Sequence, residues 1–492
     1  TMLSMTDWLL LTVGLLTAIY WYMSWNLGYW RARGVYTLPG ALPGVGHTLD
    51  ALLMRRGVQW ICIQAYYATK GHPAVGLYTF RQPVLMVRDP DLIQDVLIKE
   101  FSSFHDNAVE VDEKVDPYVS RNPFITRGQR WKTLRQKLSP AFSPVRIKVM
   151  FPLIQAVSQE FNKYIKKHLH ENINLNQVTG LYTSEVVAKC AFGLDGNAFN
   201  DPDAPFYQHG RKLWDGTLNN AIESFIIVIF PSINQILKRS FFPKETVEFF
   251  ESVIKQTMEY REKAPDKVAD NDYLQFLINL QNKNEFSFVD IVAQCLTFFT
   301  DGFETSSLTA SFALYELTMN PDIQESVRQE VLATESLTYE SLSSLPLLDR
   351  VLQETMRKYS VFTMTKECSK DFTLQADGRS FPVQRGQHVL VPVHAVHNDP
   401  DIYPNPDKFD PDRFLPENIK TRHPISFMGF SAGPRTCLGN KFASCQVKVF
   451  LANVLANFKL VKCNKTAEKM KLNPMLIVPM AESGIWIQFQ EL

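Results

Sequence analysis

The hydrophobic and polar positions predict a mainly helical chain with small sheets contributed from both of its ends. Helical periodicity dominates roughly residues 91–360. Short runs of alternating or β-branched residues predict strands, at residues 75–79, 84–87, 372–374, 389–393 and 485–489. Neither a low-complexity linker nor an internal repeat follows residue 50. The pattern therefore predicts one large domain over residues 51–492.

The N-terminal part of the chain has the pattern of a membrane anchor. Residues 8–30 form a run of 23 positions without a charge, with aromatic residues at both ends. A helix of that length reaches about 35 Å, enough to cross the apolar part of a bilayer. Arg31 and Arg33 follow the run, which favours a cytosolic location for the rest of the chain. We therefore predict a transmembrane anchor over residues 1–30. The alternative, a cleaved signal peptide, lacks a basic start and an A-x-A-like cleavage site.

Two further segments qualify this picture. Residues 38–46 hold two prolines and three glycines, which predicts a stiff hinge within residues 31–50. Gly44 and Gly46 have no third glycine at dinucleotide-binding spacing, so a Rossmann interpretation is weak. The apolar residues 225–230 are too few to cross a membrane, and both a buried location and a membrane-dipping surface remain open.

One long helix is predicted between Ser287 and Pro321. Ser287 and Asp290 have capping-box spacing, and Pro321 ends the periodic segment. Gly302 and the hydroxyl residues after it predict a kink or an opened turn in the middle. Four residues fall on one face of this helix, namely Phe298, Gly302, Thr305 and Thr309. A functional groove and an ordinary packing face are both compatible with that spacing.

Composition excludes several classes of protein. Lys plus Arg and Asp plus Glu are 51 each, so no basic excess indicates a nucleic-acid partner. The seven cysteines are scattered and odd in number, which argues against a disulfide framework and favours a reducing compartment. The ten histidines include no zinc-binding spacing, and no phosphate-binding P-loop occurs.

The segment of residues 430–439, FSAGPRTCLG, carries the strongest chemical pattern. Gly433 and Gly439 flank Cys437, and an amphipathic helix is predicted directly after them. A thiolate just before a helix is stabilised by the helix dipole, and glycines let a flat ligand approach the backbone. Arg435 is suited to binding a carboxylate. By itself, a buried structural cysteine in a glycine-rich loop remains the common alternative.

This segment resembles the haem-binding motif F-x-x-G-x-R-x-C-x-G of the cytochrome P-450 superfamily at every fixed position. Further matches follow the family's order, at residues 131–135 (WKTLR), 302–306 (GFETS), 354–357 (ETMR) and 409–414 (FDPDRF). The resemblance covers essentially the whole chain. Residues 103–106 and 301–305 are most similar to microsomal insect members.

The resemblance implies a cytochrome P-450 fold, a single large haem domain behind an N-terminal transmembrane helix, and haem b as cofactor. Cys437 is implied as the axial thiolate ligand of the iron and Phe430 as its shield. Arg435, Trp131 and Arg135 are implied as donors to the haem propionates. Glu354, Arg357 and Arg413 are implied as a buried charge network that holds the haem loop.

The resemblance also implies a reaction. Glu304 and Thr305 resemble the acid–alcohol pair that relays protons to iron-bound oxygen, which favours monooxygenation. A haem-thiolate isomerase or dehydratase needs no such delivery and is the first alternative. A non-catalytic haem or lipophile binder is the second, because a binder could keep every motif.

Two positions depart from the family pattern. Asp301 stands where a small residue is usual, and we include it among the candidate catalytic residues. It could hydrogen-bond within the helix, contact a polar group of the substrate, or form an ester with a haem methyl. Lys366 stands where an arginine is usual, so it can meet a propionate only as a point charge.

The implied partners are a separate NADPH-cytochrome reductase, with cytochrome b5 as a further candidate, because no flavin or NADPH fingerprint occurs. A docking face is predicted on two helices, from Arg130, Lys132, Lys137, Lys441 and Lys448. The implied substrate is small and lipophilic. The implied location is the endoplasmic reticulum membrane, with the catalytic domain facing the cytosol.

Overall fold

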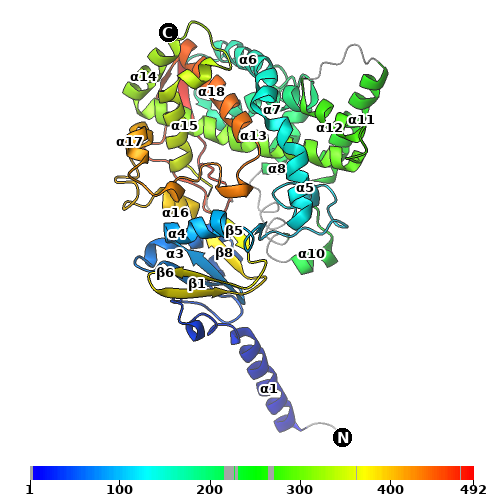
Figure 1. Cartoon of the computed structure of the whole chain (residues 1–492), viewed down its shortest axis with the longest axis vertical. Helices are drawn as coiled ribbons and strands as arrows, with labels where there is room; N and C mark the ends of the chain where they lie inside the picture. Colours follow the sequence, from blue (N-terminus) through cyan, green and yellow to red (C-terminus); the bar gives the residue numbers. More distant parts are fainter. Residues whose placement is uncertain (1–3, 215–226, 228–230, 264–270, 362, 477) are drawn as a thin grey trace.

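The computed structural model describes residues 4–214, 227, 231–263, 271–361, 363–476 and 478–492, and its helical body makes up most of the molecule (Figure 1). The helices are α1 (Met5–Ser24), α2 (Leu49–Leu52), α3 (Val58–Ala68), α4 (Pro90–Gln94), α5 (Gly128–Leu138), α6 (Pro144–Lys166), α7 (Leu175–Val187), α8 (Pro205–Trp214), α10 (Pro231–Leu237), α11 (Lys244–Lys263), α12 (Tyr273–Gln281), α13 (Phe288–Met319), α14 (Pro321–Leu332), α15 (Pro346–Lys358), α16 (Val393–His397), α17 (Pro416–Ile419) and α18 (Asn440–Asn457). The strands are β1 (Ala74–Thr79), β2 (Gln82–Val87), β3 (Asp106–Asn107), β4 (Ile173–Asn174), β5 (Met364–Glu367), β6 (Phe372–Ala376), β7 (Arg379–Val383), β8 (His388–Val391), β9 (Phe458–Val461) and β10 (Trp486–Glu491).

Helix α13 crosses the helical body and packs against α7, α15 and α18 (Figure 1). The predicted capping box is confirmed: the Ser287 hydroxyl accepts from the Asp290 N–H, and the Asp290 carboxylate accepts from the Ser287 N–H at 2.9 Å. The prediction of an opened turn near Gly302 is wrong, because α13 stays α-helical over all 32 residues. The hydroxyls of Thr305 and Thr309 donate to carbonyls four residues earlier without opening the helix.

The largest sheet has five strands in the order β1-β2-β8-β5-β3. Strands β1 and β2 form an antiparallel pair, and β8 joins β2 in parallel before β5 and β3 continue antiparallel. The predicted strand at residues 389–393 ends earlier, at Val391, because Pro392 has no N–H for the ladder and precedes α16. The other predicted strands are confirmed to within one or two residues.

The sheet has its own core, separate from that of the helical body. The segment before β1 belongs to it: Trp30 is fully buried and its indole N–H donates to the Leu77 carbonyl at 3.1 Å. His47 accepts from the Tyr78 N–H at 3.0 Å, which fastens the proline- and glycine-rich segment to β1. Whether residues 31–50 act as a hinge stays a prediction.

Helix α1 projects from the sheet end of the molecule (Figure 1), and none of its side chains is buried. Within the residues that the structure describes, no helix has both the length and the apolar character needed to cross a bilayer. The spanning helix predicted over residues 8–30 is therefore not shown. The uncharged run is divided, because α1 ends at Ser24 and Trp30 packs into the sheet core. Residues 225–230 lie outside the described part of the chain, apart from Ile227, which is buried.

Candidate functional site

The loop that precedes α18 holds Cys437 through hydrogen bonds to its own backbone. The Cys437 N–H and the Thr436 hydroxyl both donate to the Phe430 carbonyl, at 2.9 and 3.0 Å. Gly433 adopts a φ of +71°, and a Cβ there would overlap the Leu97 carbonyl oxygen. Gly439 caps α18, so the sulfur stands beside the first turn of that helix. The loop is therefore built to hold one side chain in one place.

Cys437 differs from the other cysteines, all seven of which are described. Five are buried and Cys463 is partly buried, whereas Cys437 is exposed. Its surface is accessible, yet protein surrounds it, and this desolvation raises the pKa of its thiol. The Gly439 N–H and the Arg135 guanidinium lower that pKa, and Asp301 raises it. The thiolate that the sequence predicts would therefore need a positively charged partner at the sulfur to be stable.

Helix α13 presents Asp301 and Thr305 to this thiol. The two residues are one turn apart and both are exposed. The Thr305 hydroxyl donates to the Asp301 carbonyl oxygen at 2.6 Å. Surrounding protein raises the pKa of the Asp301 carboxyl to about 6, against the opposing effect of hydrogen bonds from Asn122 and Thr300. The Gln446 side chain of α18 donates to the Gly302 carbonyl of α13 at 3.3 Å, so α13 packs against the helix that follows the thiol loop, and the Asp301 carboxyl raises the pKa of Cys437.

The predicted face of α13 changes character along its length. Phe298 is buried against Phe142, Tyr273 and Phe442. Gly302 and Thr309 are half-buried, and only Thr305 among the four is exposed. The packing interpretation therefore holds at Phe298, and the functional interpretation is compatible with the exposed Thr305.

Glu304 points to a different part of the protein. Its side chain is buried, and the Arg211 guanidinium on α8 lowers its pKa against the larger effect of burial. Burial raises the pKa of Glu304 to about 7. Adjacent helical residues project about 100° apart, so Thr305 meets the site while Glu304 packs toward α8. Their joint role in moving protons stays a prediction.

Arg435 braces three segments of the chain. Its guanidinium donates to the carbonyls of His105, Pro123 and Thr126, at 2.8 to 3.0 Å, and to the Asp106 carboxylate at 3.0 Å. It also stacks over the Trp131 ring at 4.0 Å, which brings two predicted residues together. Four donors are thus used within the protein. Burial lowers the pKa of Arg435 to about 10.

Lys366 shares these partners. It is buried on β5, and its ammonium group donates to Asn107 at 3.0 Å and toward the His105 carbonyl at 3.5 Å. Burial and the nearby Arg435 lower the pKa of Lys366 to about 7. Residues 103–106 resemble insect members of the family in sequence, but the motifs predict no role for them. The structure makes Asp106 the shared anion of this cluster, with His105, Arg127 and Arg435 around it.

Glu354, Arg357 and Arg413 form a buried charge cluster. Arg357 meets both carboxylate oxygens of Glu354, at 2.7 and 2.9 Å, and Arg413 lies 3.3 Å from the same carboxylate. Arg357 also donates to the His397 carbonyl at 2.9 Å, and the His397 ring accepts from the Met428 N–H at 2.8 Å. Bonds therefore run from the cluster to the start of the thiol loop.

Comparison with known proteins decides the family. The family model described as Cytochrome P450 matches residues 39–489. The chain is 34% identical to "Probable cytochrome P450 6a13" of Drosophila melanogaster, with 98% of each chain covered. It is 33% identical to "Cytochrome P450 6k1" of Blattella germanica and 32% identical to "Cytochrome P450 6A1" of Musca domestica, with 97 to 99% of each chain covered.

The chain belongs to the cytochrome P450 family. The resemblance read from the motifs, including the similarity to insect members, is confirmed. Family membership makes the protein a haem-iron oxidoreductase of the monooxygenase type.

The residues present in this cytochrome P450 fit a haem. Cys437 offers an accessible sulfur at a helix start, and Arg135 lies close enough to influence it. Within the described part of the chain, the Arg135 guanidinium and the Trp131 indole N–H have no hydrogen-bond partner, so both are available to carboxylates. Among the described residues, no cluster of three or more His, Cys, Asp or Glu side chains could hold a metal ion, so the candidate iron ligand is the single Cys437.

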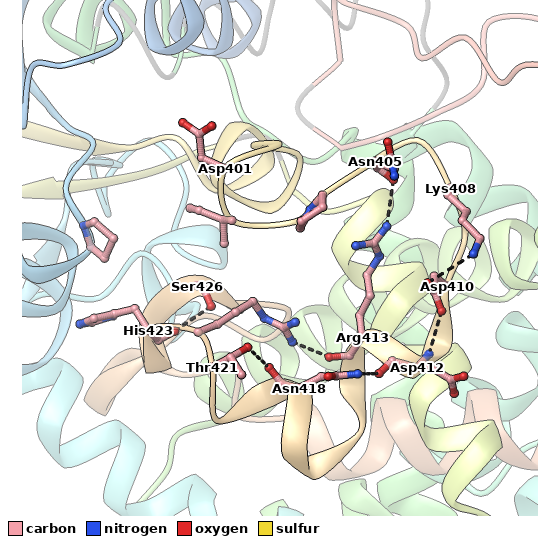
Figure 2. Close-up of a pocket in the computed structure, with 14 residues that line it drawn as sticks. Asp401, Asn405, Lys408, Asp410, Asp412, Arg413, Asn418, Thr421, His423 and Ser426 are labelled. Carbon is pink, nitrogen blue, oxygen red and sulfur yellow. Dashed lines mark hydrogen bonds and ion pairs between the residues drawn. The ribbon is translucent and has the colours of Figure 1, made fainter.

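One groove of this cytochrome P450 lies away from the thiol site. It has a volume of about 660 Å³ and lies in the meander, residues 401–426 (Figure 2). Figure 2 shows Arg413 with its guanidinium directed at Asn405, and hydrogen bonds that link Asn418, Thr421 and Asp412. Its lining contains none of the predicted site residues except the structural Arg413. The groove therefore reflects how the meander folds.

Proposed function

We propose that this cytochrome P450 is a membrane-tethered monooxygenase that inserts one oxygen atom of O2 into small lipophilic substrates. Electrons would come from NADPH through a separate reductase, and the cofactor would be haem b. The observation that carries the proposal is the accessible Cys437 thiol in a rigid loop, faced by Asp301 and Thr305. Haem bound through Cys437 would supply the redox chemistry that activates O2.

The chain's own residues would divide the remaining tasks. Gly433 and Gly439 shape the loop that presents the sulfur, and Phe430 supplies the carbonyl that fixes it. Arg135 and Trp131 would hold the propionates, with Lys366 and Arg435 behind them. Arg435 would have little hydrogen-bonding capacity left for a propionate, because four of its donors already bond within the protein.

Thr305 favours monooxygenation over the two alternatives. Its hydroxyl is exposed on the face of α13 toward the thiol and can hold a proton or a water there. A haem-thiolate isomerase or dehydratase needs no such group. A non-catalytic binder does not need this hydroxyl either. Measurement of product formation with a reductase tests that alternative.

Reductase docking would use a basic face near α5 and α18. Arg130 and Lys137 are paired with Glu113 and Glu285. The prediction that Lys448 belongs to this face is wrong, because its side chain is buried and paired with Asp349. Lys132 and Lys441 are exposed and have no ion pair among the described residues. An acidic reductase, or cytochrome b5, would meet these two lysines, and binding would weaken in salt.

Tethering to the endoplasmic reticulum membrane would use α1. Its exposed apolar side chains include Trp8, Leu11 and Leu16. An apolar groove of about 370 Å³ continues this surface to Val45, Leu52 and Phe80. Exposed apolar surface of this extent is typical of membrane contact. The proposed division is an anchor over residues 1–30, a connection over 31–50 and a catalytic domain over 51–492.

The test of the reaction uses the spectrum and the product together. The CO-bound ferrous protein should show the absorbance typical of a thiolate ligand, and Cys437→Ser should abolish it while Cys463→Ser should not. With a reductase, NADPH and 18O2, the product should carry one labelled atom. A retained thiolate spectrum in Cys437→Ser would refute the ligand, and a product without label would refute monooxygenation.

The test of the tether compares two truncations. Removal of residues 1–24 should leave a haem-loaded protein that sediments less with liposomes. Removal of residues 1–30 should also destabilise the sheet core, because it takes away the buried Trp30, at a cost of about 3–5 kcal/mol. Unchanged liposome binding by the shorter truncation would contradict a tether in α1.

A further inference from the structure

Asp301 is an accessible carboxylate without a cation. Among the described residues, no Lys, Arg or His nitrogen lies within ion-pair distance of it. Its protein partners are two neutral donors at long distances, Asn122 at 3.4 Å and Thr300 at 3.2 Å. Thr300 also bonds the Leu296 carbonyl, so it serves Asp301 only in part. The carboxylate therefore keeps acceptor capacity in a partly desolvated place.

Two other enclosed carboxylates, those of Asp106 and Glu354, have firm cationic partners, whereas Glu304 is buried on the α8 side of α13 with no ion pair among the described residues. Asp106 has Arg435 at 3.0 Å, and Glu354 has Arg357 at 2.7 Å. Arg121, the cation nearest to Asn122 in sequence, is taken by Glu113 and Asp290. The cation that would match Asp301 is thus not supplied by the described residues. A carboxylate in partly desolvated surroundings is stabilised by a positive partner.

The surroundings of Asp301 also select the body of such a ligand. The Asn122 side-chain oxygen accepts from the Phe124 N–H at 2.7 Å, which orients its amide toward Asp301. The Phe124 side chain is 58% exposed, two residues after the Asn122 whose amide meets the carboxylate. The carboxylate suits a positive nitrogen, and an exposed aromatic side chain in the same segment suits an apolar body on that ligand.

We propose that Asp301, oriented with Asn122, is a recognition site for substrates that carry a protonated amine on a lipophilic body. The proposal rests on the proposed function, because it places the amine beside the thiol site of a monooxygenase. Asp301 is exposed on α13 one turn before Thr305 and directly before Gly302, whose carbonyl accepts from Gln446 on α18 at 3.3 Å, so an amine held at Asp301 would place the substrate on the face where Thr305 is exposed.

The experiment measures binding to the haem-loaded protein by substrate-induced spectral shifts. The probes are a hindered tertiary alkylarylamine and its neutral isostere with carbon in place of nitrogen. The hindered nitrogen prevents direct ligation of iron, which a different spectral shift would reveal. Wild-type protein should bind the amine about tenfold or more tightly than the isostere. Loss of the ion pair in Asp301→Asn should weaken amine binding by about tenfold to a hundredfold and leave the isostere within about twofold.

Three results would overturn the proposal. They are equal binding of both probes by wild-type protein, unchanged amine binding by Asp301→Asn, and equal weakening of both probes by that variant. Asp377→Asn, in the exposed turn between β6 and β7, controls for net charge alone. The comparison of amine and isostere binding by wild-type protein needs no variant. It therefore tests the proposal even if Asp301→Asn binds haem poorly. A wild-type protein without the thiolate spectrum would instead contradict the proposed function.

Discussion

The charge network of α15 and α16 differs from the exposed side of α13 in how its polar groups are bonded. In that network, Glu354, Arg357 and His397 are buried and joined by bonds of 2.7 to 2.9 Å. On α13, Asp301 and Thr305 are exposed, and the carboxylate has only two long hydrogen bonds.

This difference distinguishes charged residues that stabilise the fold from charged residues that are free to interact with a ligand. A fully paired buried charge has no capacity left for a ligand, and removal of one partner strands the other. An accessible charge with weak partners costs stability but can respond to a substrate. Substitution of a fully paired buried charge should therefore unfold the protein. Substitution of an accessible, weakly paired residue should leave the fold intact and change the chemistry.

The largest expected effect is that of Arg357→Ala. It strands Glu354 and the His397 carbonyl in the core, at a cost of about 3–5 kcal/mol. We expect insoluble or haem-free protein, measured by expression, haem content and thermal unfolding. Arg379→Ala, an exposed arginine on β7, is the matched control. A stable, haem-loaded Arg357→Ala protein would break the comparison from its structural side.

Thr305→Ala should fold and load haem but lose coupling. Loss of a positioned proton-transfer group costs about 10²–10⁴-fold in its step, so NADPH use should continue while product falls and peroxide appears. Thr305→Ser should restore much of the product, because it keeps the hydroxyl. Product per NADPH is the measurement, and an unchanged ratio would remove Thr305 from the chemistry.

Gly433→Ala tests the rigidity of the thiol loop against Gly378→Ala. Both glycines have φ near +70°, so both substitutions carry about 1–2 kcal/mol of backbone cost. Only at Gly433 would the new Cβ overlap another backbone atom, which adds about 1–3 kcal/mol. We expect a lower melting temperature and poorer haem retention for Gly433→Ala. Equal effects of the two variants would mean that the loop adjusts freely.

The smallest expected effect is the pH dependence of stability from Glu304. Its pKa in the folded protein is about 7 and its ordinary value 4.5, so only the unfolded chain ionises between these limits. Ionisation there stabilises the unfolded state, so the free energy of unfolding falls as pH rises from about 4.5 to 7.

Glu304→Gln should remove that fall, on the order of 1–3 kcal/mol between pH 4.5 and pH 8. Denaturant titrations at both pH values measure it, with the exposed Glu417→Gln as control. An unchanged pH dependence in Glu304→Gln would show that this carboxyl is not desolvated in the folded protein.

Much of the architecture could be predicted from local pattern. The capping box at Ser287 and the stop at Pro321 set both ends of α13, because caps and prolines act within one turn. The spacing of Glu354 and Arg357 predicted their contact, since i and i+3 meet on a helix. The fate of residues 8–30 could not be read this way. An uncharged run looks the same whether it faces lipid or, like Trp30, fills a protein core.

By itself the sequence determined the family, the mainly helical class and the identity of Cys437, because these depend on residue types at fixed short spacings. The tertiary structure decided which way each side chain points and what it meets. It turned Glu304 toward α8 and Asp301 toward the thiol, and it gave Arg435 its partner Asp106, 329 residues away in the chain. The physical reason is that the strength of a charge in a protein depends on its desolvation and its neighbours. Those neighbours are set by packing between distant segments.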